Sequence, residues 1–179
     1  MEKEKTYKVG DTGPAGGIIF HDEGNSSGGW QYLEAAPVET EFKAEWGSYK
    51  ILETKDKYGQ YEREYISIVD TSEAIGSGKR NTGIIVKHLQ ELGETGRAAQ
   101  VPVNLNYGGF SDWFLPSKDE LNLMYQNLRQ KEIGDFSNDW YWSSTEYNPY
   151  NACYQHFGKT HQYYKYKDYM NLVRAVRAF

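Results

Sequence analysis

The chain ends in the stretch YWSSTEYNPYNACYQHFGKTHQYYKYKDYMNLVRAVRAF, residues 141–179, whose pattern decides the fold. This stretch holds eight of the 16 tyrosines, with Asn, His, Lys and Asp between them and few aliphatic side chains. Aromatic rings with a polar tip are typical of surfaces that contact another molecule. We therefore interpret residues 141–179 as a recognition segment, and the preceding residues as the rigid scaffold that holds it.

The spacing of side chains inside this segment predicts a strand with two different faces. Within residues 152–157, Cys153 and Phe157 fall on one face, whereas Tyr154 and His156 fall on the other, because strand side chains alternate. We predict that the Cys153 face packs on the core and the Tyr154 face contacts a partner. One face of the segment would then specify the fold and the other the ligand.

Framing strands are predicted on both sides of these residues. Residues 141–145 begin with two aromatic side chains that we assign to the core. Residues 158–160 form a turn, and residues 161–166 return as another strand. Residues 172–179 are expected to close the chain as one buried strand, next to an N-terminal hairpin.

The N-terminal part of the sequence predicts this hairpin and, after it, a solvated polar segment. Residues 17–21 and 29–37 read as two short strands across a Gly, Asn and Ser loop. In the polar region that follows, Trp46 is expected to be buried. Residues 50–64 are charged and predict a solvated loop or a small ribbon, and residues 65–70 predict a short strand or a buried extended segment.

Two helices are predicted in the middle of the chain. The first begins at Asn81 or Thr82, has apolar residues at helical spacing, and ends at Gly93. The second begins at a capping box, in which Ser117 accepts from the third helical N–H and Glu120 reaches back. Helices in the middle with strands at both ends give an α+β order rather than an alternating one.

Composition restricts the class of protein. The 179 residues fit a single domain over residues 1–179, of which residues 1–8 are expected to fray. A net charge of −5 argues against binding nucleic acid, which requires a basic surface. The lone Cys153 excludes an internal disulfide and zinc clusters built from cysteine. No apolar run approaches the ~20 residues of a membrane span, and the start lacks a signal peptide, so the compartment stays open.

Six segments, in this order along nearly the whole chain, carry the motifs of a known family. They are VGDTGPAGGIIF (9–20), GWQYLEAAP (29–37), TSEAIGSGKRNTGII (71–85), GGFSDWFLPSKDELNLMY (108–125), YWSSTE (141–146) and LVRAVRAF (172–179). Together they resemble the Lcl C-terminal domain family. The most specific pieces are DWFLPSKDEL and the pair formed by YWSSTE and VRAVRAF.

This resemblance implies a C-type lectin-like fold, related to the formylglycine-generating-enzyme type. In that fold the N- and C-terminal strands pair, two helices flank them, and a loop-rich sheet presents the ligand face. Some members of the family are described as surface adhesins that bind sulfated glycans. Others are variable proteins of diversity-generating retroelements, in which adenines of a template are copied inaccurately, so that Asn codons become other codons while the frame stays fixed.

The end of this chain resembles the second kind. A change at the first adenine of an Asn codon of type AAY gives Tyr, His or Asp, the residue types that crowd here with Asn. The resemblance implies that the ligand-binding residues are Tyr147, Asn148, Tyr150, Asn151, Tyr154, His156, His161, Tyr163, Tyr164, Tyr166, Asp168 and Tyr169. The residues that resemble the fixed frame are Ala152, Gln155, Phe157, Gln162 and Lys167. Two residues depart from the family's pattern. Cys153 stands where relatives often have Trp, and Leu172 stands where they often have Tyr or Arg.

Two groups of side chains in this segment have metal-binding chemistry. A transition-metal site would use His156, His161 and Asp168, but no second carboxylate or thiolate completes it. A calcium site would draw on Glu146, Asn148 and Asn151. We predict no metal and no cofactor, and leave a bound calcium ion open.

Two arginines lie in the apolar closing stretch. Arg174 and Arg177 are three residues apart and would point to opposite faces of a strand. We interpret them as buried structural ion pairs rather than ligand contacts. Their candidate partners are Asp112, Asp119 or Glu120, in the segment that leads into the second helix.

The sequence thus predicts a non-enzymatic recognition or adhesion domain whose C-terminal face is diversified by a retroelement. Formylglycine-generating chemistry uses paired cysteines, and Cys153 is alone. The expected partner is a protein, another macromolecule or a glycan on a cell surface, with no nucleic acid and no membrane span. The expected location is extracellular, on a cell surface or on a phage particle. The alternatives are a carbohydrate- or glycosaminoglycan-binding adhesin of fixed specificity and a structural module of a surface or phage-tail protein.

Overall fold

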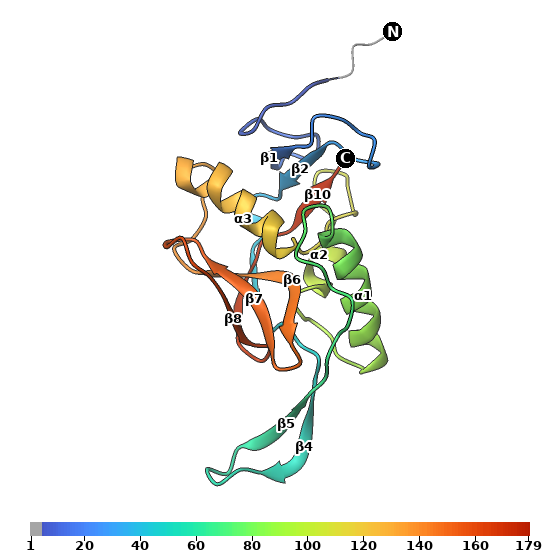
Figure 1. The fold of residues 1–179 in the computed structure, drawn as a ribbon, viewed down its shortest axis with the longest axis vertical. Coiled ribbons are helices and arrows are strands. Elements are labelled where there is room, and N and C mark those ends of the chain that lie inside the picture. The colour runs from blue at the N-terminus through green and yellow to red at the C-terminus, as the bar shows by residue number, and fades with distance from the viewer. Residues whose placement is uncertain (1–4) are drawn as a thin grey trace.

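The computed structural model describes residues 5–179 and joins the two ends of the chain in one small sheet (Figure 1). Strand β1 (Ile18–Asp22) pairs with β2 (Tyr32–Ala35), whose other side pairs with β10 (Val176–Ala178), all antiparallel. The first and last strands therefore share a sheet, as predicted, with β2 between them. The expectation that residues 1–8 fray lies partly outside the described residues and stays a prediction.

The second sheet carries the recognition segment. Its strands, in spatial order, are β3 (Phe42–Ala44), β9 (Asn171–Val173), β6 (Trp140–Asn148), β7 (Asn151–His156) and β8 (Gln162–Tyr166). The prediction of a single closing strand over residues 172–179 is wrong. The chain leaves the second sheet after β9 and enters the first as β10. Between the two strands, the Arg174 side chain donates to Glu41 and to the Ala36 carbonyl.

Two further strands form a ribbon that projects from the body of the molecule (Figure 1). They are β4 (Tyr49–Lys55) and β5 (Tyr61–Tyr65), and they confirm the small ribbon predicted over residues 50–64. Beyond β5 the chain is irregular. Ile68 is buried there, whereas Val69 is exposed, so this part is an extended segment anchored at one residue.

Three α-helices occur in residues 5–179, one more than predicted. They are α1 (Gly78–Glu91), the short α2 (Gln100–Val103) and α3 (Lys118–Asn127). Single 3-10 turns occur at Val38–Thr40 and Arg129–Lys131. One turn of helix, such as α2, has too few residues to show a hydrophobic period, which explains why the sequence did not reveal it.

The helix starts test the capping predictions. The capping box of α3 is confirmed, since the Ser117 hydroxyl accepts from the Glu120 N–H and the Glu120 carboxylate accepts from the Ser117 N–H at 2.8 Å. The predicted start of α1 at Asn81 or Thr82 is wrong, because the helix begins at Gly78 with Ser77 at the cap position. Asn81 and Thr82 lie inside the helix and are buried, where Asn81 holds the Ser72 backbone and Thr82 donates to the Gly78 carbonyl.

The core has two main parts, on the two sides of β6. One part packs Tyr141 and Phe157 against α3, and the other packs Trp142 and Trp46 against α1. The assignment of the aromatic pair at the start of residues 141–145 to the core is confirmed, as is the burial of Trp46. The side chains of neighbouring residues on one strand thus pack on opposite sides of the sheet.

Both arginines of the closing stretch are buried and form ion pairs, as predicted, although the Asp112 partner of Arg177 is partly exposed. Arg177 Nε donates to Asp112 Oδ1 at 2.6 Å, one of the partners expected. Arg174 Nε donates to Glu41 Oε1 at 2.7 Å rather than to an acidic residue at the start of α3. The guanidinium of Arg174 also donates to the carbonyls of Ala36 and Gly134, both at 3.0 Å. This one side chain therefore ties two distant segments to the end of the chain, the connection between β2 and β3 and the loop at Gly134.

Candidate functional site

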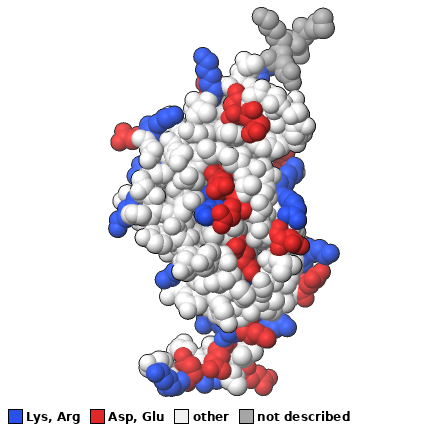
Figure 2. All heavy atoms as spheres, in the orientation of Figure 1, with Lys and Arg blue, Asp and Glu red and all other residues white. Residues whose placement is uncertain are grey.

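Six of the predicted ligand-binding residues form an exposed group that we call the tyrosine surface. Each of these side chains is 48–55 % exposed. They are Tyr147, Tyr150, Tyr163, Tyr164, Tyr166 and Tyr169. They lie on β6, on β8 and in the two turns that flank β7 and β8. In Figure 2 the part of the visible face that lies over β7 and β8 is mostly uncharged.

The tyrosine surface has two sides. Register pairs Cys153 with Tyr164 and Tyr154 with Tyr163, so the neighbours Tyr163 and Tyr164 point to opposite faces of the sheet. The predicted buried face of β7 is confirmed at Cys153, Gln155 and Phe157. The other face of β7 is not fully outward, because Ala152 is buried and Tyr154 packs against the core. For β8 the prediction of one buried face is wrong. Strand β8 lies at the edge of its sheet, where both faces reach solvent.

Each side is stiffened by ring contacts. On the side of Cys153, the rings of Tyr147 and Tyr164 stack with centroids 4.0 Å apart. On the other side, Trp140 stacks on Tyr154, also at 4.0 Å. Tyr163 approaches Trp140 edge-on at 6.1 Å. Stacked rings present broad flat surfaces. The stacking also restricts the rotamers of these side chains in the free protein.

Most of the remaining predicted residues form hydrogen bonds or ion pairs within the protein. The Asn148 side chain accepts from the backbone of Tyr150 and Asn151, both at 2.9 Å, and so closes the turn between β6 and β7. Nδ1 of His156 accepts from the Gly158 N–H. Asp168 pairs with Arg63 of the ribbon at 3.3 Å. His161 is exposed, and Tyr154 and Asn151 are half-buried.

A buried lysine anchors the far end of β8. Nζ of Lys167 donates to Glu146 Oε2 at 2.9 Å and to the Ile66 carbonyl at 3.0 Å, and it lies 4.9 Å from the Trp46 ring. Burial lowers the pKa of Lys167, although Glu146 opposes this. Glu146 also accepts from the Ile68 N–H at 2.6 Å, so this carboxylate, considered above for calcium, is engaged in holding the scaffold.

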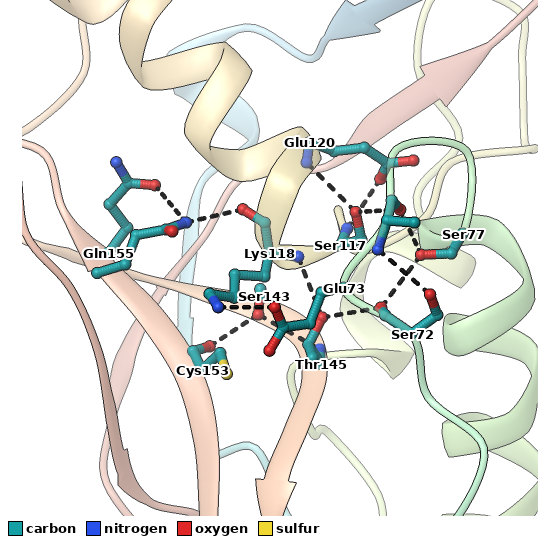
Figure 3. A network of polar contacts seen from close by, with 12 residues as sticks. Ser72, Glu73, Ser77, Ser117, Lys118, Glu120, Ser143, Thr145, Cys153 and Gln155 are labelled. Carbon is teal, nitrogen blue, oxygen red and sulfur yellow. Dashed lines mark hydrogen bonds and ion pairs between the residues drawn. The ribbon is translucent and has the colours of Figure 1, made fainter.

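Side chains from α3 support the inner face of β7 and β8. The Gln155 amide donates to Asn122 at 3.0 Å, and the Gln162 amide donates to the Lys118 carbonyl at 2.9 Å. Figure 3 shows this network continuing to Glu120, which is buried and accepts from the Gly76 N–H at 2.8 Å. Burial raises the pKa of Glu120. The sequence marked the two glutamines only as frame residues, with no signal for their partners.

The lone thiol lies beneath the tyrosine surface. Cys153 is buried on β7, close to the Lys118 and Glu73 ion pair (Figure 3). Burial raises the pKa of Cys153 to about 11. A thiol with so high a pKa is protonated at neutral pH and is a poor nucleophile.

We expect the Cys153 thiol of the native protein to be unreactive toward an aromatic disulfide reagent at neutral pH, because it is buried and protonated. One equivalent should react after denaturation. The variant Lys159→Cys, in an exposed turn, is the matched control and should react in the native state. Rapid labelling of the native wild type would contradict the buried placement.

Residues 5–179 contain no group of three His, Cys, Asp or Glu side chains placed to hold a metal ion. None of the helices between residues 5 and 179 has the length and apolarity to cross a membrane.

Comparison with known proteins gives a structural relative and a family. A fimbrial protein from Bacteroides ovatus has a similar fold, with a TM-score of 0.52 and 17% identity over 83% of this chain. The matched part is 36% of that protein, so this chain spans about a third of its length. No curated protein sequence matches the chain significantly. The model of the Lcl C-terminal domain matches residues 54–177, and the chain therefore belongs to the Lcl C-terminal domain family.

Proposed function

We propose that this protein is a non-enzymatic recognition module that binds a protein or another macromolecule on a cell surface through the tyrosine surface. The observation that carries the proposal is the concentration of half-exposed tyrosines on a frame that is itself buried and hydrogen-bonded. Tyrosine supplies a large contact area with few rotatable bonds and one polar tip. A broad, two-sided surface of this kind fits a macromolecule better than a small substrate in a pocket.

The proposal includes diversification of the tyrosine surface by a retroelement. The frame residues Ala152, Gln155, Phe157 and Lys167 are buried and Gln162 is half-buried, whereas Tyr163, Tyr164 and Tyr166 are exposed. Exposed side chains can change with little effect on stability, while buried ones cannot. The test is genomic. A near-identical copy of the coding segment, with Asn codons in place of the Tyr, His and Asp codons, should lie beside a reverse-transcriptase gene, and its absence from the source genome would refute diversification.

A surface location and a C-type lectin-like arrangement are parts of the same proposal. The likeness to a fimbrial protein supports a module of a larger surface protein, because the chain corresponds to about a third of that relative. The buried, protonated state of Cys153 supports a role without catalysis. The family resemblance supports the lectin-like arrangement of strands and helices.

Replacing three tyrosines of β8, in the variant Tyr163→Ser, Tyr164→Ser, Tyr166→Ser, is expected to weaken binding at least about tenfold, because interface tyrosines are frequent hot spots. Arrays of cell-surface proteins and of glycans would identify the ligand and rank the variants. The control is Tyr58→Ser, Tyr61→Ser, which removes exposed tyrosines from the ribbon. Binding that survives the β8 changes but not the ribbon changes would refute the tyrosine surface. Retention on heparin at physiological salt would instead support the glycan-binding adhesin.

A further inference from the structure

Strand β8 ends its sheet with backbone groups that have no partner strand. The order β3-β9-β6-β7-β8 places no described element beyond it, and Figure 1 shows β8 at the margin of the molecule. Lys167 N–H donates to Tyr150, and His156 N–H donates to His161, so odd-numbered positions of β8 face β7. The N–H and C=O groups of Gln162, Tyr164 and Tyr166 therefore point away from the sheet.

Those open groups are nearly unused in the described part of the chain. The Tyr166 carbonyl accepts from the Tyr169 N–H at 3.1 Å within a turn, and the backbone hydrogen bonds of residues 5–179 give the others no partner. Natural edge strands are normally protected by bulges, proline, charged side chains such as lysine, inward charges or very short length.

Strand β8 carries only one of these protections, the lysine at position 165. The pairs β1–β2, β4–β5 and β6–β7 each contain a register shift, whereas β7–β8 runs from Asn151–Tyr166 to Gln155–Gln162 without one. The strand contains no proline, and its five residues exceed the three of β3 at the opposite edge. Its one charge, on Lys165, lies over the Tyr169 ring at 4.0 Å. The edge is regular and able to accept another strand.

We propose that two copies of the protein pair through their β8 strands, antiparallel, about a two-fold axis at Tyr164. In this register Gln162 of each copy lies opposite Tyr166 of the other. The three outward N–H groups and the C=O groups of Gln162 and Tyr164 gain a partner, and the Tyr166 C=O accepts a second hydrogen bond beside that from Tyr169. Tyr163 lies opposite Lys165 of the second copy in a non-hydrogen-bonded pair, where side chains approach most closely. An ammonium group beside a tyrosine ring is a favourable contact there.

Neighbouring registers are less favourable. An axis at Lys165 would place two lysines directly opposite each other, and like charges in that position are destabilising. An axis at Tyr163 would leave the Tyr166 N–H without a partner. The sequence of β8 is thus self-complementary in one register only, which is the reason to assign the edge to a second copy rather than to an unrelated strand.

Pairing through the backbone would leave the tyrosine side chains on the two faces of the sheet. The tyrosine surface would then continue across the axis, and a dimer would present two copies of it for a ligand with repeated sites. A contact limited to one short strand is small, so we expect weak association that depends on protein concentration. This inference concerns a second copy and does not rest on the proposed ligand.

The variant Tyr164→Pro tests the pairing directly. Proline removes the outward N–H of residue 164 but none of the bonds between β7 and β8, and edge strands tolerate proline on their open side. Sedimentation at rising concentration should show a monomer–dimer equilibrium for the wild type and a monomer for Tyr164→Pro. The control Tyr164→Ala keeps the N–H and should still associate. A wild type that stays monomeric, or Tyr164→Pro that associates equally, would overturn the proposal.

Amide hydrogen exchange of the wild type supplies a second readout that needs no variant to fold. At high concentration the N–H groups of Gln162, Tyr164 and Tyr166 should become protected, whereas those of Tyr163 and Lys165 should be protected at every concentration. Association with protection at any other strand or loop would place the contact elsewhere and refute pairing through β8. Neither measurement includes a ligand, so their outcome is independent of the proposed function.

Discussion

Trp142→Ala is expected to lower the free energy of unfolding by about 3–5 kcal/mol, the cost of removing a fully buried aromatic side chain. The Trp142 ring is 0 % exposed and packs beside Trp46 between the second sheet and α1. Its Nε1 donates to the Ala44 carbonyl at 3.0 Å, so the substitution also leaves a buried acceptor without its donor. The cavity and the lost hydrogen bond both lower the free energy of unfolding.

The matched control is Tyr164→Ala, on the same sheet but about half exposed. Removing this ring should change the free energy of unfolding by less than about 1 kcal/mol, since it contacts mainly Tyr147. Denaturant unfolding followed by circular dichroism measures both variants. A large loss of stability in Tyr164→Ala would mean that the tyrosine surface is part of the core, and would remove the basis of the proposed function.

Lys167→Met is expected to lower the free energy of unfolding by about 3–5 kcal/mol, because it breaks a buried ion pair from one side. The lysine side chain is 0% exposed and that of Glu146 is 6% exposed. Methionine fills similar space but leaves the Glu146 carboxylate without its cation and the Ile66 carbonyl without a donor. The end of β8 and the segment after β5 should loosen together.

A double-mutant cycle tests whether this loss of stability comes from the ion pair between Lys167 and Glu146. Glu146→Gln should also destabilise, and combining it with Lys167→Met should cost less than the sum of the two, since the pair is then removed from both sides. Lys165→Met, two positions earlier and half-buried, is the control and should have little effect. Additive losses would show that Lys167 and Glu146 do not act as a pair.

The same lysine gives a pH dependence with a defined sign. Burial holds the pKa of Lys167 below its usual value of 10.5 in the folded state. As pH rises from that lowered pKa toward 10.5, the unfolded chain binds more protons than the folded one, so this residue contributes increasing stability. Wild type compared with Lys167→Met should show this rise, and equal pH profiles would contradict a charged, buried Lys167.

Local sequence patterns were sufficient to predict much of the scaffold. The alternation of residues 152–157, the capping box at Ser117 and the helix end at Gly93 are set by neighbours in the chain, so the sequence alone predicted them. The start of α1 was misplaced because Asn81 has the side chain of a cap but uses it to hold a distant loop at Ser72. A residue type that can serve two roles does not reveal which one the fold requires.

The sequence by itself determined the family, the first framing strand and the tyrosine-rich character of the candidate site, because these depend on residue identity and short-range periodicity. Only the tertiary structure decided that both faces of β8 are open, since this depends on which strand ends the sheet. It also decided the partners of Arg174 and Lys167, which lie 133 and 21 residues away. A buried charge is paired by whichever acidic group the fold brings within reach, and no local pattern encodes that distance.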